Sequence, residues 1–277
     1  MLAAPAKRID SFVLLTPLLA LVAKMIAAAS LVVTASVVAE RSGPFVAAMI
    51  ATLPISAGPA LVFLALDHDD AFIAGAALGA MATNAVNGVF CLVYAALAQR
   101  LDTVRALGLA LIAWFAMALP VTGQVFSLAQ LLLGSLVLFA ALIPFSLRYM
   151  KVPMPALAAR ARFAIPIRAL SVAALIGVLT LLSSAIGPAY SGMLVVFPIV
   201  LSSLIVILQP RVGGRASAAV MASTLPGLLG FAAALAVVHL ASAPLGRFQA
   251  LALGLLTSFA WNGGLLLLRL VTRRARR

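Results

Sequence analysis

Acidic side chains are scarce in this chain, which has six Asp and Glu residues against 19 Lys and Arg residues in a total of 277. All six lie at the ends of apolar runs, so no carboxylate within a run is available for a proton relay, Na⁺ ligation or general-base catalysis. The single cysteine, Cys91, excludes an internal disulfide framework, and we expect it to be a small buried hydrophobe. The two histidines, His68 and His239, lie in different halves of the chain, so nothing has the spacing of metal ligands.

Motifs of nucleotide binding and nucleophilic catalysis are also missing. The chain has no Walker motif, no glycine-rich nucleotide loop and no serine nucleophile elbow. We therefore predict that the protein is not an enzyme and that it uses no cofactor and no metal. The net charge of +13 lies in short loops rather than on a basic helix face, so nucleic acid is not an expected partner.

Apolar residues dominate what is present. The chain is 65% hydrophobic and 9% charged, with a mean hydropathy of +1.23, and about 20 apolar residues cross a bilayer as a helix. The sequence therefore predicts an all-α, polytopic membrane protein of nine helices. The predicted spans are Phe12–Val38, Pro44–Leu66, Ala71–Ala98, Thr103–Leu119, Val125–Leu147, Ile165–Ala185, Pro188–Leu208, Ala216–Leu240 and Leu245–Val271.

The first run, Phe12–Val38, has two interpretations. It is long for one crossing, Pro17 interrupts it, and Lys24 lies midway along it. It is either one tilted helix, or a short interfacial or re-entrant piece followed by a crossing that begins at Lys24. The second interpretation gives ten helices.

Cations are distributed unequally between the two sides of the predicted membrane. With nine crossings, one side collects 15 of the 19 Lys and Arg residues, and the other carries the acidic turn at residues 67–70. The positive-inside rule makes the first side cytoplasmic. This places the C-terminus in the cytoplasm and, in the nine-helix version, the N-terminus outside.

An internal repeat links the two halves of the chain. Residues 24–55 align without a gap to residues 168–199, an offset of 144 that we call the repeat offset, and seven of the 32 pairs are identical. The identical pairs include Gly43-Pro44 with Gly187-Pro188, and Pro54 with Pro198, which are residues that fix backbone geometry. We interpret this as the duplication from which many membrane transporters are built.

The two repeats are predicted to be inverted. The equivalent turns are acidic at residues 67–70 and basic at residues 211–215, as expected if they face opposite sides of the membrane. The resulting organisation has four parts: residues 1–23 as an N-terminal apolar segment, 24–122 as the first four-helix repeat, 123–164 as a linking helix and basic cytoplasmic loop, and 165–277 as the second repeat and basic tail.

Pro54 and Pro198 lie near mid-membrane in equivalent spans. A proline removes a backbone donor and frees carbonyl groups in the preceding turn. The functional interpretation is a pair of discontinuous helices that form a substrate site at the repeat interface. The alternative is a kink in each helix, because proline is common in membrane helices.

Four polar side chains complete the candidate site. Lys24 and Arg168 either point inward and attract an anionic group or extend to the headgroups. Asn84 and Asn87, on one face of the third span, either hold helices together by hydrogen bonds or line a substrate pathway.

The segment from Arg41 to Ile55, with its counterpart at Ile186–Ile199, resembles the core of the GlpM-like family of small bacterial inner-membrane proteins. The resemblance rests on the small residues, the Leu53-Pro54 and Phe197-Pro198 steps and the helix spacing. It implies a fused pair of four-helix units in a bacterial inner membrane, with a link to exopolysaccharide production.

Two functions follow from these features. The first is a small secondary transporter or flippase for an anionic or amphipathic substrate, with its site at the repeat interface. The alternative is a non-transporting scaffold subunit of an envelope or exopolysaccharide assembly complex. The expected partners are membrane lipid and a small-molecule or lipid-linked substrate, and a homo-oligomer or a complex with another membrane protein is also compatible with the sequence.

Overall fold

The computed structural model describes residues 6–41, 57–150, 152 and 164–274 of the chain, and the regular structure in these ranges is helical, without a strand. Six stretches within them are long and apolar enough to cross a membrane, judged by length and composition. The all-α, multi-pass class is as predicted. The elements are α1 (Ala6–Arg41), α3 (Ala57–Asp67), α4 (Asp70–Leu97), α5 (Thr103–Thr122), α6 (Leu128–Ser146), the 3-10 helix η1 (Leu147–Tyr149), α7 (Ala164–Val195), α8 (Ile199–Ser223), α9 (Leu225–Leu245) and α10 (Arg247–Arg274).

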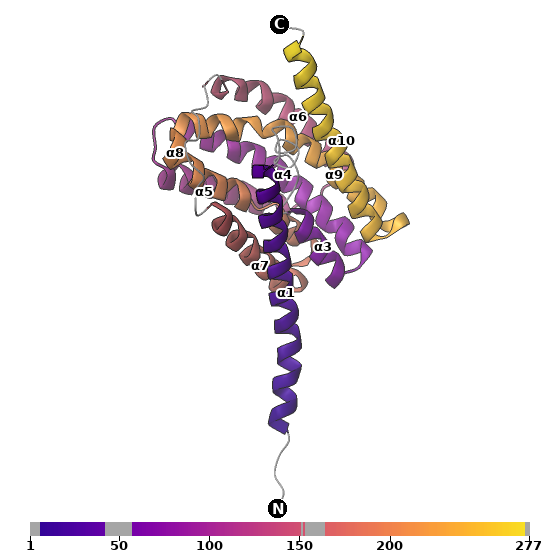
Figure 1. Ribbon diagram of the computed structural model, residues 1–277. Helices are drawn as coiled ribbons and strands as arrows, with labels where there is room; N and C mark the ends of the chain where they lie inside the picture. The colour runs from indigo at the N-terminus through magenta and orange to yellow at the C-terminus, as the bar shows by residue number, and fades with distance from the viewer. Residues whose placement is uncertain (1–5, 42–56, 151, 153–163, 275–277) are drawn as a thin grey trace, which may run out of the picture.

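Helix α4 lies at the centre of the bundle (Figure 1) and contacts α5, α6, α7, α8 and α9. Most of its residues are buried, whereas α5, α6 and α10 are largely exposed. The exposed side chains of these outer helices are mainly apolar, as expected of helices that face lipid rather than water.

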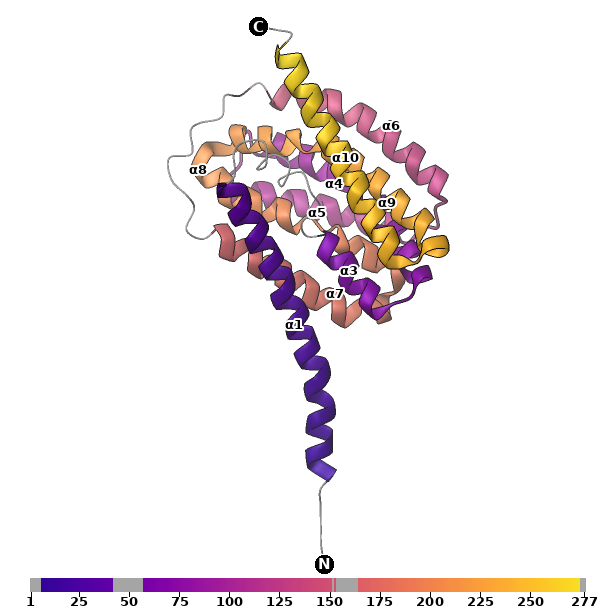
Figure 2. The ribbon, with the colours of Figure 1, turned by 45° about the vertical axis from the view of Figure 1, so that its right-hand side comes forward.

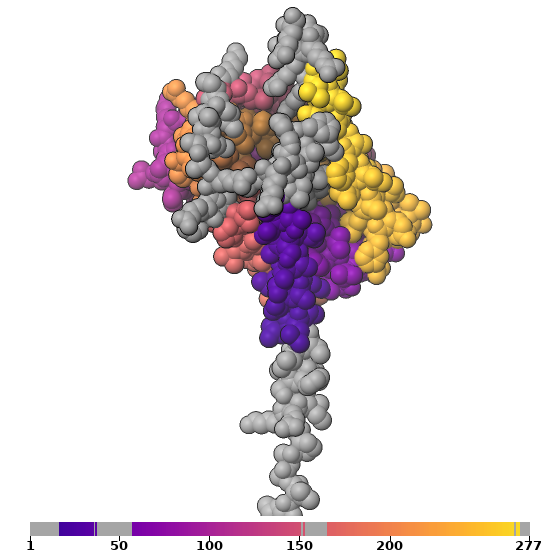
Figure 3. Space-filling view, in the orientation of Figure 1, coloured from indigo at the N-terminus to yellow at the C-terminus, as the bar shows by residue number. Residues whose placement is uncertain are grey.

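Helix α1 settles the interpretation of the first span. It is one continuous helix of 36 residues with Pro17 inside it, so the split version that gave ten helices is wrong. At 1.5 Å per residue it is about 54 Å long, more than the hydrocarbon core of a bilayer. Its N-terminal part extends beyond the other helices in both ribbon views (Figure 2), and Figure 3 shows its described side chains at the surface, between α7 and α3.

The predicted crossing Pro188–Leu208 is not a single helix. α7 continues past a kink at Gly187 to Val195, and helical structure resumes only at Ile199. The interruption includes Pro198, where the sequence predicted either a discontinuity or a kink. The two positive-φ glycines, Gly187 with φ 75° and Gly213 with φ 81°, lie between predicted spans.

The structure describes two other predicted spans in more detail. Helical structure from Ala216 to Leu240 is shared between α8 and α9, which meet at Thr224. Of the predicted span Pro44–Leu66, the structure describes only α3, a helix of 11 residues; its earlier part lies outside the described residues.

Small residues bring α4 and the second part of α7 into backbone contact. A Cβ atom added to Gly79 would overlap the carbonyl oxygen of Ala189, and one added to Gly192 would overlap that of Ala76. Such close approach is the usual role of glycine at helix crossings in membranes. The position of α7 after its kink is therefore fixed by the absence of side chains.

This packing predicts that Gly79→Ala and Gly192→Ala each lower the free energy of unfolding by about 1–3 kcal/mol, the usual effect of overpacking. Gly108→Ala in α5 and Gly134→Ala in α6 are matched controls, because no atom lies within 4 Å of the added Cβ; alanine should leave stability unchanged or raise it there. Thermal unfolding in detergent measures all four. Equal melting temperatures for the two pairs would contradict the close contact.

Candidate substrate site at the break between α7 and α8

The site begins with a break in the helical backbone at Val196, Phe197 and Pro198. Pro198 cannot donate a backbone hydrogen bond, and its ring clashes with the preceding turn. α7 therefore ends at Val195, and Pro198 becomes the N-cap of α8 with a non-helical ψ of 43°. The sequence predicted a discontinuity at this proline, and the helical backbone is interrupted there. The upstream Gly187-Pro188 pair also has the expected form, a positive-φ glycine followed by a helical proline.

Asn87 satisfies the carbonyl group that the break exposes. Its Nδ2 atom donates to the Val196 carbonyl oxygen at 2.8 Å, and its Oδ1 atom accepts a hydrogen bond from Nε1 of Trp114 at 2.7 Å. Asn87 and Trp114 are both buried, and an unsatisfied polar group is costly in a membrane. One amide near the middle of α4 thus connects α5, α4 and the break.

Asn84 lies one turn before Asn87. Its Nδ2 atom donates to the Leu228 carbonyl oxygen at 2.8 Å, so both amides bond between helices, as in the structural interpretation of this pair. Its Oδ1 atom is buried and has no hydrogen-bond partner among the described residues. In the second interpretation, in which these amides line a substrate pathway, this oxygen is predicted to bind the substrate.

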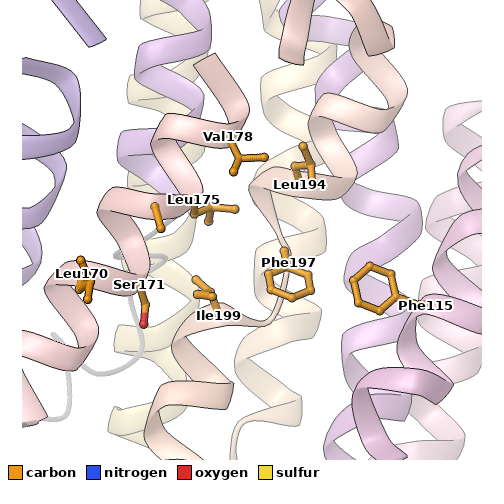
Figure 4. A pocket seen from close by; sticks show the side chains of 9 residues that line it. Phe115, Leu170, Ser171, Leu175, Val178, Leu194, Phe197 and Ile199 are labelled. Atoms are coloured by element: carbon orange, nitrogen blue, oxygen red, sulfur yellow. The ribbon is translucent and has the colours of Figure 1, made fainter. Parts of the chain in front are cut away.

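An apolar groove of about 440 Å³ lies beside the break. Figure 4 shows Phe197 on the non-helical link, side chains of α7 on one side and Phe115 of α5 on the other. The lining residues are Phe115, Leu170, Ser171, Ala174, Leu175, Val178, Leu194, Phe197 and Ile199. Ser171 is the one polar residue among them, and its hydroxyl donates to the Ile167 carbonyl oxygen, so the groove presents hydrocarbon.

The structure does not bring Lys24 and Arg168 together. Lys24 forms an ion pair with Asp67 at 2.5 Å and is mostly shielded from solvent, a partner that neither predicted role included. Arg168 is half-buried in the first turns of α7. Ser183 lies about four helical turns further along α7, and its Oγ atom is 2.8 Å from Nε2 of His68, in the turn after Asp67. Arg168 is therefore about 22 Å along α7 from Ser183, the residue that contacts the turn holding the partner of Lys24.

Pro54 falls outside the described residues. Of the six residues that the sequence singled out, Asn87 and Pro198 meet at the break, through the Val196 carbonyl group. Asn84 is one turn away on α4. Arg168 precedes Ser171, at the end of the groove, by about one turn.

The acidic residues whose side chains are described all lie at or next to the end of a helix: Asp67, Asp69, Asp70 and Asp102. Asp69 and Asp102 cap α4 and α5, and Asp67 pairs with Lys24. Asp70 accepts hydrogen bonds from the backbone N–H and the side chain of Arg247.

Sequence reasoning missed Trp114. This residue is fully buried, and its ring contacts Phe197 edge to face with centroids 5.1 Å apart. A signal was present, because Ala106, Ala110, Trp114 and Ala118 recur every four residues and mark one helix face. The structure shows that this face is the buried face of α5.

Comparison with known proteins finds no matching family model, no matching curated protein and no matching solved structure. The resemblance to the GlpM-like family therefore stays a prediction from the residues quoted for it.

We predict that Asn87→Leu destabilises the protein by about 0.6–2 kcal/mol, the range measured for hydrogen bonds between membrane helices, because it strands the Val196 carbonyl and the Trp114 N–H. Trp114→Phe should also destabilise the protein, because it leaves Asn87 Oδ1 unpaired and a cavity where the buried indole ring was. A double-mutant cycle by unfolding in detergent measures the coupling. Strictly additive effects would show that the two side chains do not share one network.

Proposed function

We propose that the protein is a small transporter or flippase of the bacterial inner membrane, acting on an amphipathic substrate at the break between α7 and α8. The observation that carries the proposal is the interruption between α7 and α8. It lies beside the middle of the buried helix α4 and next to an apolar groove. Interrupted helices near the midplane are where many transporters hold their substrates, through backbone groups that a continuous helix keeps internal.

The chemistry around the break favours an amphipathic substrate over a hydrophilic one. On one side lie the amides of Asn84 and Asn87, including the unpartnered Oδ1 atom of Asn84. On the other lies the hydrocarbon groove. A molecule with a polar group and an apolar chain matches both, whereas a small ion would leave the groove unused.

Helix boundaries support the proposal that the fold consists of two repeats joined by α6. The repeat offset relates Asp69, the N-cap of α4, to Gly213, the kink in α8. It also relates Thr103 to Arg247, the residues that begin α5 and α10. These boundaries lie outside the aligned segments 24–55 and 168–199 from which the offset was defined, so they support it independently.

Side-chain contacts support the same offset. Ala65 and Gln209 are equivalent under it, and each is hydrogen-bonded to a residue at the start of the last helix of a proposed repeat, within two residues of its first position. Arg247 Nε donates to the Ala65 carbonyl oxygen at 2.6 Å, and Gln209 Nε2 donates to the Leu101 carbonyl oxygen at 3.0 Å.

The direction of the equivalent helices supports inversion. Three hydrogen bonds join α4 to its proposed equivalent, the α8–α9 segment from residue 214 onward: His239 with Ala74, Asn84 with Leu228, and Tyr94 with Ser217. Positions in the second segment fall as those in α4 rise, so the helices run antiparallel. Equivalent antiparallel helices that cross at Asn84 and Leu228, themselves related by the repeat offset, are what a two-fold axis in the membrane plane produces.

We expect Pro198→Ala to abolish or strongly reduce transport while leaving stability equal or higher, because alanine restores a helical hydrogen bond and closes the break. The measurement is translocation of a fluorescently labelled phosphatidylglycerol across reconstituted vesicles, read by dithionite quenching, beside thermal unfolding in detergent. Pro144→Ala is the matched control, because Pro144 lies inside α6, away from the site.

A variant that is stable but inactive at Pro198, beside an active Pro144→Ala variant, supports the transporter. If wild-type protein moves no labelled lipid, the flippase proposal fails for that lipid class. A Pro198→Ala variant that keeps full activity would remove the break from the mechanism, and loss of stability and function together would favour the scaffold alternative.

The inverted arrangement predicts opposite sidedness for the two equivalent turns. Asp69→Cys and Arg211→Cys, each in a Cys91→Ser background, place a thiol at an exposed position on the proposed outer and cytoplasmic sides. An impermeant thiol reagent added to intact cells should label the first and reach the second only after lysis. Equal labelling in intact cells would contradict inversion.

A further inference from the structure

We infer that the groove between α7, the break and α5 binds one acyl chain of a bilayer lipid. The inference deepens the proposed function, and the groove is a substrate site only if that function holds. Its physical basis is the groove itself: about 440 Å³ in volume, within the range of pockets that enclose small ligands.

The groove has the length and depth of a chain site. Its α7 wall runs from Leu170 to Val178, which spans about 12 Å at the helical rise. Leu175 is buried on the α7 wall, and the half-buried Phe197 faces that wall from the break (Figure 4). A flexible chain lying along α7 would therefore pass between α7 and Phe197.

The groove is continuous with the outer apolar surface of the bundle. Its rim residues Leu170, Val178 and Phe115 are 72%, 44% and 41% exposed. The next apolar residues outward on the same two helices, Leu181 and Ile112, are also exposed. Both helices belong to the stretches long enough to cross a membrane, so the groove opens sideways into the region of lipid chains.

The lining of the groove offers no free hydrogen-bonding side chain to a hydrophilic ligand. The hydroxyl of Ser171 is already bonded to its own helix at 2.7 Å, and the other lining side chains are hydrocarbon. A polar ligand would lose its water without gaining hydrogen bonds. An acyl chain gives up no hydrogen bonds by entering, and it fills a space that would otherwise lack contacts.

Trp114 provides a built-in reporter of the groove. Its ring lies against both Phe115 and Phe197, with centroids 5.0 and 5.1 Å apart, so it sits directly behind two lining residues. The other tryptophan, Trp261, belongs to α10 and is removed by Trp261→Phe. Bromine atoms on a chain in the groove should quench the remaining fluorescence.

The test uses the full chain with Trp261→Phe, reconstituted in phosphatidylglycerol vesicles that contain increasing fractions of lipid with brominated acyl chains. Ala174 lines the groove and is exposed within it, so Ala174→Phe fills the space. Ala140→Phe, at an exposed position on α6, is the matched control. We expect saturable quenching in the parent protein, at least a twofold loss of that quenching in Ala174→Phe, and no change in Ala140→Phe.

Equal quenching in the parent and in Ala174→Phe would overturn the inference, because lipid around the whole protein would then explain the signal. Ala174→Leu serves as a smaller filling variant if Ala174→Phe does not fold, as judged by thermal unfolding. The translocation assay separates this result from the proposed function: groove quenching in a protein that moves no lipid keeps the acyl-chain site and removes the flippase. Translocation that persists when the groove is filled removes the groove from the route.

Discussion

The contact between α4 and the short second part of α7 is the constraint on which the site depends. Gly79 and Gly192 let the two backbones touch, and this contact fixes the depth at which this part of α7 lies in the bundle. That depth places the Val196 carbonyl group beside Asn87. A side chain at either glycine would separate the helices, and the amide that closes the break would no longer reach it. The packing of small residues and the polar site are thus one arrangement.

A helix interrupted inside a membrane needs a partner for every exposed backbone group. Here the Val196 carbonyl group has a specific side-chain partner. The Asn87 amide binds the freed carbonyl group, and Trp114 fixes the orientation of that amide from the other side. Because Trp114 also packs against Phe197, the polar and apolar supports of the break share a residue. A displacement of Phe197 in the groove can therefore act on the Asn87 amide through Trp114.

Sequence reasoning located the break and singled out Asn87, which binds its carbonyl group, but it missed Trp114 and the pairing of Lys24. Pro198 and the Gly187-Pro188 pair act locally, so a sequence exposes their effect on the backbone. The pairing of Lys24 with Asp67 joins residues 43 apart, and it depends on how α1 and α3 pack, which apolar runs of similar composition do not encode. The predicted boundaries between spans near Gly187 and Gly213 coincide with positive-φ glycines, because glycine also acts on the backbone locally.

The proposed duplication makes the site asymmetric. Under the repeat offset, Asn84 corresponds to Leu228 and Asn87 corresponds to Phe231, and neither counterpart has a polar side chain. The amides thus come from the first half, while the carbonyl groups that they bind, those of Val196 and Leu228, come from the second. The two proposed repeats have similar helices, but the amide side chains of the first bind backbone carbonyl groups of the second. Because Asn84 contacts its own counterpart Leu228, a transporter built this way would bind its substrate's polar group next to the proposed two-fold axis, with amides from one half only.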